Sequence, residues 1–375
     1  MHRVVMGHFK YEGYTLAYEQ HGPESGVPVL LMHGILLDSA VNRDLAAPLV
    51  DAGFRVILLD LLGHGRSDKA EATDLRNDFF AEQVVACLDH LNIDKAVIGG
   101  LSLGAIVALH VAVQTPQRVR ALLIEMPVME NSTVFAALLL GPIVVMTHYA
   151  PWLYRPVARF LRGLPRPRSN LWESVLNAAG QDPSAIRAIL HGVLVGAVVP
   201  SRRARRKIQA PALVIGHAGD WLHEMEDART LADELPNGRL LVARSIFELR
   251  SKPERLMPEI VSFLHEVTGD KVTHLPAAPA SAAEPGLAAH FEAAVEKVRS
   301  APEDGPFKPS NDLKLKMYAL FRQARDGDIA GKRPGMLDVV GRYKYDACVA
   351  IKGMSREEAM RLYIAEVEGT ARKYA

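Results

Sequence analysis

Short apolar runs alternate with amphipathic stretches over the first part of the chain. Residues 27–33, 54–60, 95–100 and 119–126 are rich in Val, Leu and Ile and have the length of buried strands. Between these runs, apolar positions recur with the helical period at 43–52, 78–91 and 105–114. Strands that alternate with helices predict a doubly wound α/β fold, in which a mostly parallel sheet is covered by helices on both faces.

This alternation stops at residue 127 and resumes after residue 206. Residues 127–206 are helical in period, rich in Pro and Arg, and contain no good strand pattern. Two strand patterns then follow at 212–219 and 239–244, and a helical one at 258–267. We therefore expect a sheet core formed by 1–126 and 207–267, with 127–206 inserted as a helical cap.

A second domain is predicted at the carboxyl end of the sequence. Residues 268–287 are rich in Ala and Pro without an apolar period, as expected of a linker. From 288 to 375 the period is helical throughout, and Ser355 and Glu358 have the spacing of a capping box. These residues predict a small all-helical domain.

Composition narrows the classes of function. The chain of 375 residues is 49% hydrophobic and 23% charged, which predicts folded domains rather than a disordered chain. Its 44 basic and 43 acidic residues nearly cancel, so we expect no nucleic-acid partner. Cys87 and Cys348 are too far apart for a metal motif, and we expect no metal and no cofactor. The first 20 residues lack a signal-peptide pattern, so we expect a cytoplasmic protein.

The apolar segment 135–149 could contact a membrane. It is shorter than the ~20 residues that a helix needs to cross a bilayer, and Gly141 and Pro142 interrupt it. Two interpretations remain: a buried or lid helix pair, or an apolar lid that makes peripheral contact with lipid or holds an acyl chain.

Candidate chemistry begins at the sequence GLSLG, residues 100–104. An apolar strand pattern precedes this G-x-S-x-G motif and an Ala/Val-rich helix pattern follows it. Strand, tight turn and helix are the setting of a nucleophile elbow, which would expose the hydroxyl of Ser102 at the carboxyl end of the sheet. The alternative is a glycine turn with an inert serine.

Two further motifs, HGI at 33–35 and DLLGHGRSD at 60–68, precede this one in the order seen in the α/β-hydrolase fold superfamily. Residues 1–267 resemble that superfamily. The resemblance implies that the backbone N–H groups of Ile35 and Leu103 form an oxyanion hole. His33 and His64 are expected to hold loops in place rather than act as bases.

The resemblance also implies an acid and a histidine. Asp220 follows a late strand pattern and is the preferred acid, with Glu125 as the alternative position. The histidine is missing from its usual place, because Pro253 and Glu254 set a register that puts Ile246 there. We expect His223 to act as the substitute base, or else the domain to be inactive. His217 is expected to be buried.

A basic run, SRRARRK at 201–207, precedes the strand pattern at 212–219. It could be a solvated helix face or a patch that meets the phosphates of a charged substrate near the cap.

The C-terminal residues carry a long ordered motif, KRPGMLDVVGRYKYDA at 332–347, with YALFRQA before it and REEAMRLYI after it. Residues 288–375 resemble the acyl-CoA-binding protein family, which implies long-chain acyl-CoA as a partner. The ligand positions of that family correspond to Phe291, Tyr318, Arg322, Lys344, Tyr345 and Tyr363. Arg322 replaces a lysine and keeps its charge, and Tyr345 replaces a tryptophan and can still stack, but with less area. Tyr318 and Arg322 are also spaced i, i+4 on one helix face, and Lys344 adds a second cation for a phosphate-rich ligand.

Together the two resemblances predict an acyl-CoA-binding serine hydrolase, a thioesterase or related esterase with Ser102 as nucleophile. Two alternatives stay open: an acyltransferase, and a degenerate hydrolase fold that only binds or senses acyl-CoA.

Overall fold

A computed structural model describes residues 4–71, 75–129, 132–194, 198–220, 222–269, 287–299, 311–329, 333 and 339–374. The chain divides into two compact units, Met1–Val272 and Thr273–Ala375. The predicted linker, 268–287, falls at this division. Helix α11 ends at Thr268 and helix α12 begins at Leu287, and the residues from 270 to 286 lie outside the described ones.

Within the described residues of the first unit, eight strands form one sheet in the order β1-β2-β4-β3-β5-β6-β7-β8. Strands β3 to β8 are parallel, and β2 pairs antiparallel with β1 and β4. The strands are β1 (Val4–Tyr11), β2 (Tyr14–His21), β3 (Pro28–Met32), β4 (Arg55–Leu59), β5 (Ala96–Leu101), β6 (Val119–Glu125), β7 (Ala212–His217) and β8 (Gly238–Ala243). The mostly parallel sheet was predicted, whereas the hairpin β1–β2 was not.

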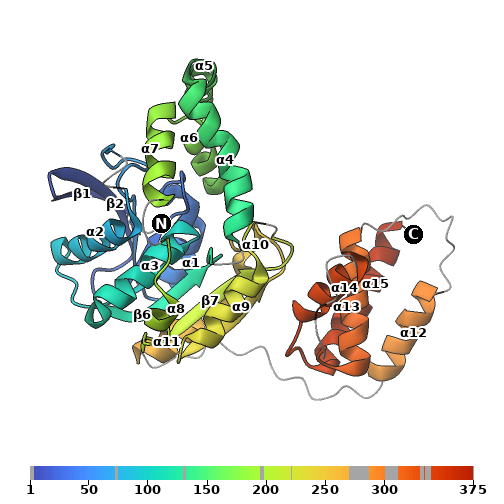
Figure 1. The fold of residues 1–375 in the computed structure, drawn as a ribbon. Helices are drawn as coiled ribbons and strands as arrows, with labels where there is room; N and C mark the ends of the chain where they lie inside the picture. Colours follow the sequence, from blue (N-terminus) through green and yellow to red (C-terminus); the bar gives the residue numbers. More distant parts are fainter. Residues whose placement is uncertain are drawn as a thin grey trace. The chain divides into compact units, whose positions relative to one another are not determined.

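Helices cover both faces of this sheet (Figure 1). One apolar core lies between the sheet and α2, α3 and α9, and a second lies between the sheet and α1, α10 and α11. The helices are α1 (Arg43–Asp51), α2 (Asn77–His90), α3 (Leu103–Gln114), α9 (Met225–Glu234), α10 (Glu248–Ser251) and α11 (Met257–Thr268), with short 3-10 turns at Ser39–Asn42, Pro116–Arg118 and Pro253–Arg255. The two-sided covering explains why strands such as β3 and β4 are apolar at nearly every position.

Among its described residues, the predicted cap consists of helices joined by turns and contains no strand. It contains α4 (Thr133–Tyr149), α5 (Pro151–Arg162), α6 (Asn170–Ala179), α7 (Pro183–Leu194) and the short α8 (Arg202–Arg205). The apolar segment 135–149 lies within α4. Among the described residues, no helix is long and apolar enough to cross a membrane.

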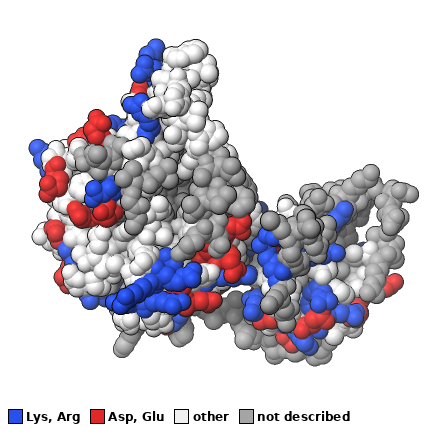
Figure 2. Space-filling model, in the orientation of Figure 1, with Lys and Arg blue, Asp and Glu red and all other residues white. Residues whose placement is uncertain are grey.

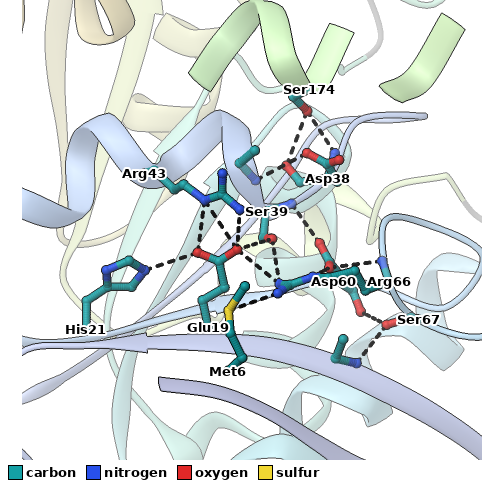
Figure 3. A network of polar contacts seen from close by, with 12 residues as sticks. Met6, Glu19, His21, Asp38, Ser39, Arg43, Asp60, Arg66, Ser67 and Ser174 are labelled. Atoms are coloured by element: carbon teal, nitrogen blue, oxygen red, sulfur yellow. Dashed lines mark hydrogen bonds and ion pairs between the residues drawn. The ribbon is translucent and has the colours of Figure 1, made fainter. Parts of the chain in front are cut away.

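A buried polar network fixes the loops beneath the cap (Figure 3). The Glu19 carboxylate contacts Arg43 at 2.7 Å and Arg66 at 3.1 Å, and Arg66 also contacts Asp60 at 3.1 Å. Burial alone would raise the pKa of Glu19, but hydrogen bonds from His21 and Arg43 lower it to about 2. The Glu19 carboxylate is therefore ionised near neutral pH, and its ion pairs hold the first strands and α1 together.

The cap is hydrogen-bonded to the loop that follows β3. Ser174 in α6 donates to, and accepts from, the backbone of Asp38, and the Asn177 amide donates to the Asp38 carboxylate at 2.7 Å. Gln181 donates to the carbonyl of Leu36 at 2.7 Å. These bonds attach the cap next to Ile35, one of the predicted oxyanion residues.

The second unit is the predicted small helical domain. Its described helices are α12 (Leu287–Arg299), α13 (Asn311–Asp326), α14 (Val339–Val349) and α15 (Arg356–Tyr374). Phe291, Leu320, Cys348 and Tyr363 are among the buried residues of their shared core. The predicted capping box is present in part, because the Ser355 hydroxyl accepts from the N–H of Glu358 at 3.1 Å.

Candidate functional site

Ser102 stands on a strained turn between β5 and α3. Its backbone has φ 53° and ψ −103°, in the positive-φ region that side chains avoid. The flanking glycines are needed for space: a Cβ at Gly100 would lie 2.7 Å from the Met32 carbonyl oxygen, and one at Gly104 would lie 2.6 Å from it. The turn therefore has the tight, strained form that the G-x-S-x-G motif predicts.

His223 lies beside this serine. Its Nε2 is 3.0 Å from the Ser102 Oγ, and its Nδ1 is 2.8 Å from Oδ2 of Asp220. The imidazole thus lies between the hydroxyl and the carboxylate, in the order that a serine, histidine and acid triad requires.

The loop after β7 sets this geometry. The second carboxylate oxygen of Asp220 accepts from the N–H groups of Leu222, at 2.8 Å, and of His223, at 3.0 Å. One carboxylate therefore closes the turn with one oxygen and orients the imidazole with the other. The next residue, Glu224, donates its N–H to the buried Ser132 hydroxyl at 2.9 Å, which ties the loop to the start of the cap.

The charge state of Asp220 determines which ring nitrogen of His223 carries the proton. Burial favours a higher pKa for Asp220, but the hydrogen bonds and charge of His223 lower it below its usual value. An ionised carboxylate only accepts, so Nδ1 of a neutral His223 ring must carry the proton. Nε2 is then free to accept a proton from Ser102 Oγ, as a general base must.

The alternative acid, Glu125, has other partners. It is buried at the end of β6, where it forms an ion pair with Arg250 and lies 3.1 Å from Nε2 of His217. Arg250 also donates to the Asn42 side chain at 2.9 Å. Burial would raise the pKa of Glu125, but the charge of Arg250 and the contact with His217 lower it to about 2. The structure thus brings Asp220, and not Glu125, to the histidine beside Ser102.

Ile246 lies in the turn after β8, where the superfamily resemblance places the histidine. It packs against a small apolar cluster that includes Leu101, next to the candidate nucleophile, Met126 and Leu171 of the cap. The position is therefore near Ser102 but provides an apolar wall instead of a base.

The remaining histidines of the loops have structural contacts. His33 and His64 are fully buried, with ring centroids 4.7 Å apart, and each donates from Nδ1 to a nearby backbone carbonyl. Burial lowers the pKa of both rings, so they stay uncharged. Nε2 of His33 accepts from the N–H of Leu61 at 3.1 Å, which links the loops after β3 and β4.

The predicted oxyanion donors lie on either side of the elbow. Leu103 is the first residue of α3, so its N–H has no partner within the helix. Ile35 lies in the turn after β3, and the carbonyl of His33 in the same loop accepts from Gly104 at 3.1 Å. This bond holds the two loops side by side. A role for these two N–H groups stays a prediction.

A cationic cleft runs between the cap and the core loops. Its volume is about 1260 Å³, and it borders Asp38 and Gln181 beside the loop of Ile35. Sequence reasoning missed this cleft, although the abundance of arginine in the cap was a signal for it. The basic side chains that line it outnumber the acidic ones, Asp38, Glu71 and Asp182; they are Arg66, Lys69, Arg162, Arg166 and Arg187.

The basic run at 201–207 lies elsewhere. Helix α8 leads into the amino-terminal end of β7, whereas Ser102 is at the carboxyl ends of the strands. Arg205 is fully buried and pairs with Glu234 at 2.8 Å, and Arg202 pairs with the same carboxylate at 2.6 Å. The run is therefore not the phosphate patch near the cap that one interpretation predicts.

In the second unit, the predicted ligand residues form two groups. Lys344 and Tyr318 lie together, with the ammonium 5.0 Å from the ring centroid, and the exposed Arg322 pairs with Asp326 one turn along α13. Phe291 and Tyr363 instead pack on each other in the core, with ring centroids 5.2 Å apart. Tyr345 is partly buried on α14. Much of the motif from 330 to 338 lies outside the described residues.

Comparisons with known proteins agree with this architecture. Residues 27–244 match the model of the alpha/beta hydrolase fold, which covers more than half of the chain, and the chain belongs to this family. Residues 288–367 match the model of the acyl CoA binding protein, so the second unit is a domain of that type.

Curated relatives resemble the second unit in sequence. The chain is 46% identical over 81 residues to the acyl-CoA-binding domain-containing protein 5 of Gallus gallus, which is 22% of this chain and 16% of that protein. The chain therefore spans only a small part of the curated relatives it matches.

Solved structures resemble the first unit. A hydrolase from Pseudomonas aeruginosa is 21% identical with a TM-score of 0.55, covering 69% of this chain and 98% of that one. The 2-hydroxy-6-oxo-6-phenylhexa-2,4-dienoate hydrolase of Rhodococcus sp. strain RHA1 is 18% identical with a TM-score of 0.58, covering 71% and 100%. At these identities the likeness shows the fold alone.

Proposed function

We propose that this protein is a serine hydrolase that cleaves long-chain acyl-CoA thioesters and binds the same compounds in its C-terminal domain. The observation that carries the proposal is the 3.0 Å contact between Nε2 of His223 and Oγ of Ser102, with Asp220 behind the ring. An acyl-CoA-binding domain on the same chain supports acyl-CoA as the substrate.

The reaction would proceed in two steps. Ser102 Oγ attacks the thioester carbonyl while His223 takes its proton, and the negative charge on the carbonyl oxygen is stabilised by the N–H groups of Ile35 and Leu103. The C–S bond then breaks, and the thiol of CoA leaves with the proton from His223. Water, deprotonated by His223, cleaves the acyl-Ser102 ester and releases the fatty acid.

The cationic cleft supports a CoA ester over an uncharged ester. Arg162, Arg166 and Arg187 line it, and a guanidinium group suits the phosphates of CoA. The small apolar cluster around Ile246 and Leu171 would contact the acyl chain.

The proposal is tested with purified protein and a fluorophosphonate probe. Ser102 should be labelled, and hydrolysis of palmitoyl-CoA should release free CoA and palmitate. Labelling that survives Ser102→Ala would show that another residue is the nucleophile, whereas no labelling and no hydrolysis would favour the scaffold alternative. Adding an acceptor alcohol distinguishes an acyltransferase from a hydrolase. An acyltransferase would form an ester of the alcohol, and the yield of palmitate would fall accordingly.

A substrate pair tests the cleft. Arg187→Ala should raise KM for palmitoyl-CoA about tenfold, in the range of a charge-assisted bond, but leave KM for the uncharged p-nitrophenyl palmitate unchanged. Arg203→Ala, an exposed arginine on α8, is the matched control. An equal effect on both substrates would contradict a role for the cleft in CoA recognition.

A further inference from the structure

Helix α5 exposes an apolar face at the end of the cap farthest from the sheet (Figure 1). Four large side chains on it are half or more exposed: Trp152 (70%), Leu153 (55%), Val157 (50%) and Phe160 (68%). With Pro156, their spacing of i, i+1, i+4, i+5 and i+8 puts them on one side of the helix. An exposed patch of this kind in a folded protein marks an interaction surface.

The other side of α5 is held by the cap. Ala158 is buried, and the Tyr154 hydroxyl donates to the carbonyl of Ala179 in α6 at 2.6 Å. The side that packs against the cap is therefore already used, and the apolar face points outward.

The charged residues of α5 itself are all basic, although the exposed Asp182, just before α7, lies near Arg155 and Arg162. Arg155, Arg159 and Arg162 are exposed on the same helix, and Arg166 and Arg168 follow in the next segment. Between residues 131 and 172 the sequence contains no Asp or Glu. The space-filling view shows the outer end of the cap mostly uncharged, with basic side chains and some acidic atoms along one side (Figure 2).

We propose that α5 docks this protein on an anionic lipid bilayer, lying in the plane of the interface with Trp152 and Phe160 among the acyl chains. Tryptophan is well suited to the boundary between headgroups and acyl chains, and arginines at the edge of the face reach lipid phosphates. The proposal places the contact on α5; contact through the apolar segment 135–149 of α4, which the sequence singles out, stays a prediction.

Charge argues for lipid over a second copy of this chain. Two α5 helices packed face to face would bring two sets of arginines together without acidic partners in that segment, which is unfavourable. An anionic bilayer instead offers phosphates to Arg155 and Arg159, which do not line the cleft. The inference does not depend on the proposed hydrolase activity, because docking requires no reaction at Ser102.

Vesicle flotation of the full chain tests the apolar face. The protein should bind vesicles of phosphatidylcholine with 30% phosphatidylglycerol more tightly than phosphatidylcholine alone. W152S/F160S should weaken binding at least tenfold, whereas V113S/V298S, which changes exposed valines on α3 and α12, should leave it unchanged. Equal binding by the two double variants would overturn the proposal.

A charge-reversal pair tests the arginines. R155E/R159E should remove the preference for anionic vesicles, and R203E/R206E on and beside α8 should keep it. Brominated lipids should quench the fluorescence of the wild type more than that of the Trp152→Phe variant. Such a difference would place the Trp152 side chain at the acyl chains, and the conservative change to Phe should not destabilise the fold. Absence of vesicle binding by the wild type, together with a dimer in sedimentation that W152S/F160S dissociates, would show that the face pairs two copies and refute the lipid assignment.

Discussion

At the scale of single residues, the position of the histidine is the main departure from the expected pattern. An imidazole normally arrives at the serine from the loop after the last strand, but that place holds Ile246. Here it comes from the loop after β7, only three residues beyond Asp220, and the same carboxylate forms the turn that makes this approach possible. The sequence could suggest His223 because of that short spacing, but only the folded loop shows that the ring reaches Ser102.

His223→Ala should reduce turnover of palmitoyl-CoA about as much as Ser102→Ala, by three or more orders of magnitude, because members of a triad act as a unit. The double variant should be no slower than either single one. Steady-state kinetics measure this, with His8→Ala, an exposed histidine on β1, as the control. Turnover that survives His223→Ala would show that another base serves Ser102, and Ile246→His in the same background would then have nothing to restore.

Glu125 makes the stability of the first unit depend on pH. Its pKa is about 2 in the folded chain and 4.5 ordinarily, so the unfolded chain binds a proton first as the pH falls. The stabilisation from the ionised carboxylate is therefore complete above pH 4.5 and is lost as the pH falls towards 2. It amounts to roughly 3 kcal/mol.

Glu125→Gln should cost about 3 kcal/mol at pH 7, because it leaves Arg250 buried without its charge partner. The variant should then lose less stability than the wild type between pH 4.5 and 2.5. Urea unfolding at several pH values measures both effects, and Glu259→Gln, an exposed carboxylate on α11, should follow the wild type. A variant with the same pH slope as the wild type would mean that Glu125 is not the group involved.

At the scale of elements, the buried strands and their helices could be predicted, and the first hairpin could not. Strands such as β5 are apolar at every position because both faces are covered, which makes them visible in the sequence. Strand β1 is mostly exposed, and β2 carries the buried Glu19 and Gln20. Ion pairs with Arg43 and Arg66 allow the charged Glu19 to be buried. These partners are far from Glu19 in the chain, so no local sequence pattern indicates a buried strand here.

The nucleophile elbow was predictable because its glycines obey a local steric rule. Gly104→Ala should lower the free energy of unfolding by about 1–3 kcal/mol and also reduce turnover, because the added Cβ would lie 2.6 Å from the Met32 carbonyl and push α3 from β3. Gly141→Ala is the matched control: it meets no atom within 4 Å and should be neutral or stabilising in α4. Thermal unfolding with kinetics compares the two, and equal effects would contradict the steric account.

At the scale of the whole molecule, two domains with complementary chemistry share one chain. The cationic cleft forms from cap helices and core loops that are distant in sequence, so composition alone could not locate it. The acyl-CoA-binding domain was recognisable because its motif is long and ordered within one short segment.

A fragment of residues 287–375 should bind palmitoyl-CoA by itself, because these residues form a compact unit with its own core. Lys344→Ala should weaken binding by roughly 1–3 kcal/mol, the range for a charge-assisted bond to a phosphate. Calorimetry measures this, with Lys352→Ala, an exposed lysine after α14, as the control. If Lys344→Ala combined with Tyr318→Phe left the affinity intact, the nucleotide would have to bind elsewhere on the domain.

The segment between the domains should keep acyl-CoA that is bound by the C-terminal domain available to the hydrolase domain of the same chain. A flexible coil of about 20 residues, the length of the Ala- and Pro-rich segment 268–287, has an end-to-end distance of roughly 25 Å, which would correspond to an effective concentration of order mM. Cutting the chain at a protease site inserted there should raise the apparent KM for palmitoyl-CoA at low substrate and leave kcat nearly unchanged, because the chemistry at Ser102 is intact while delivery is lost. The uncut chain with the same insertion is the control. Identical kinetics before and after cleavage would mean that the acyl-CoA-binding domain does not supply substrate to the hydrolase domain.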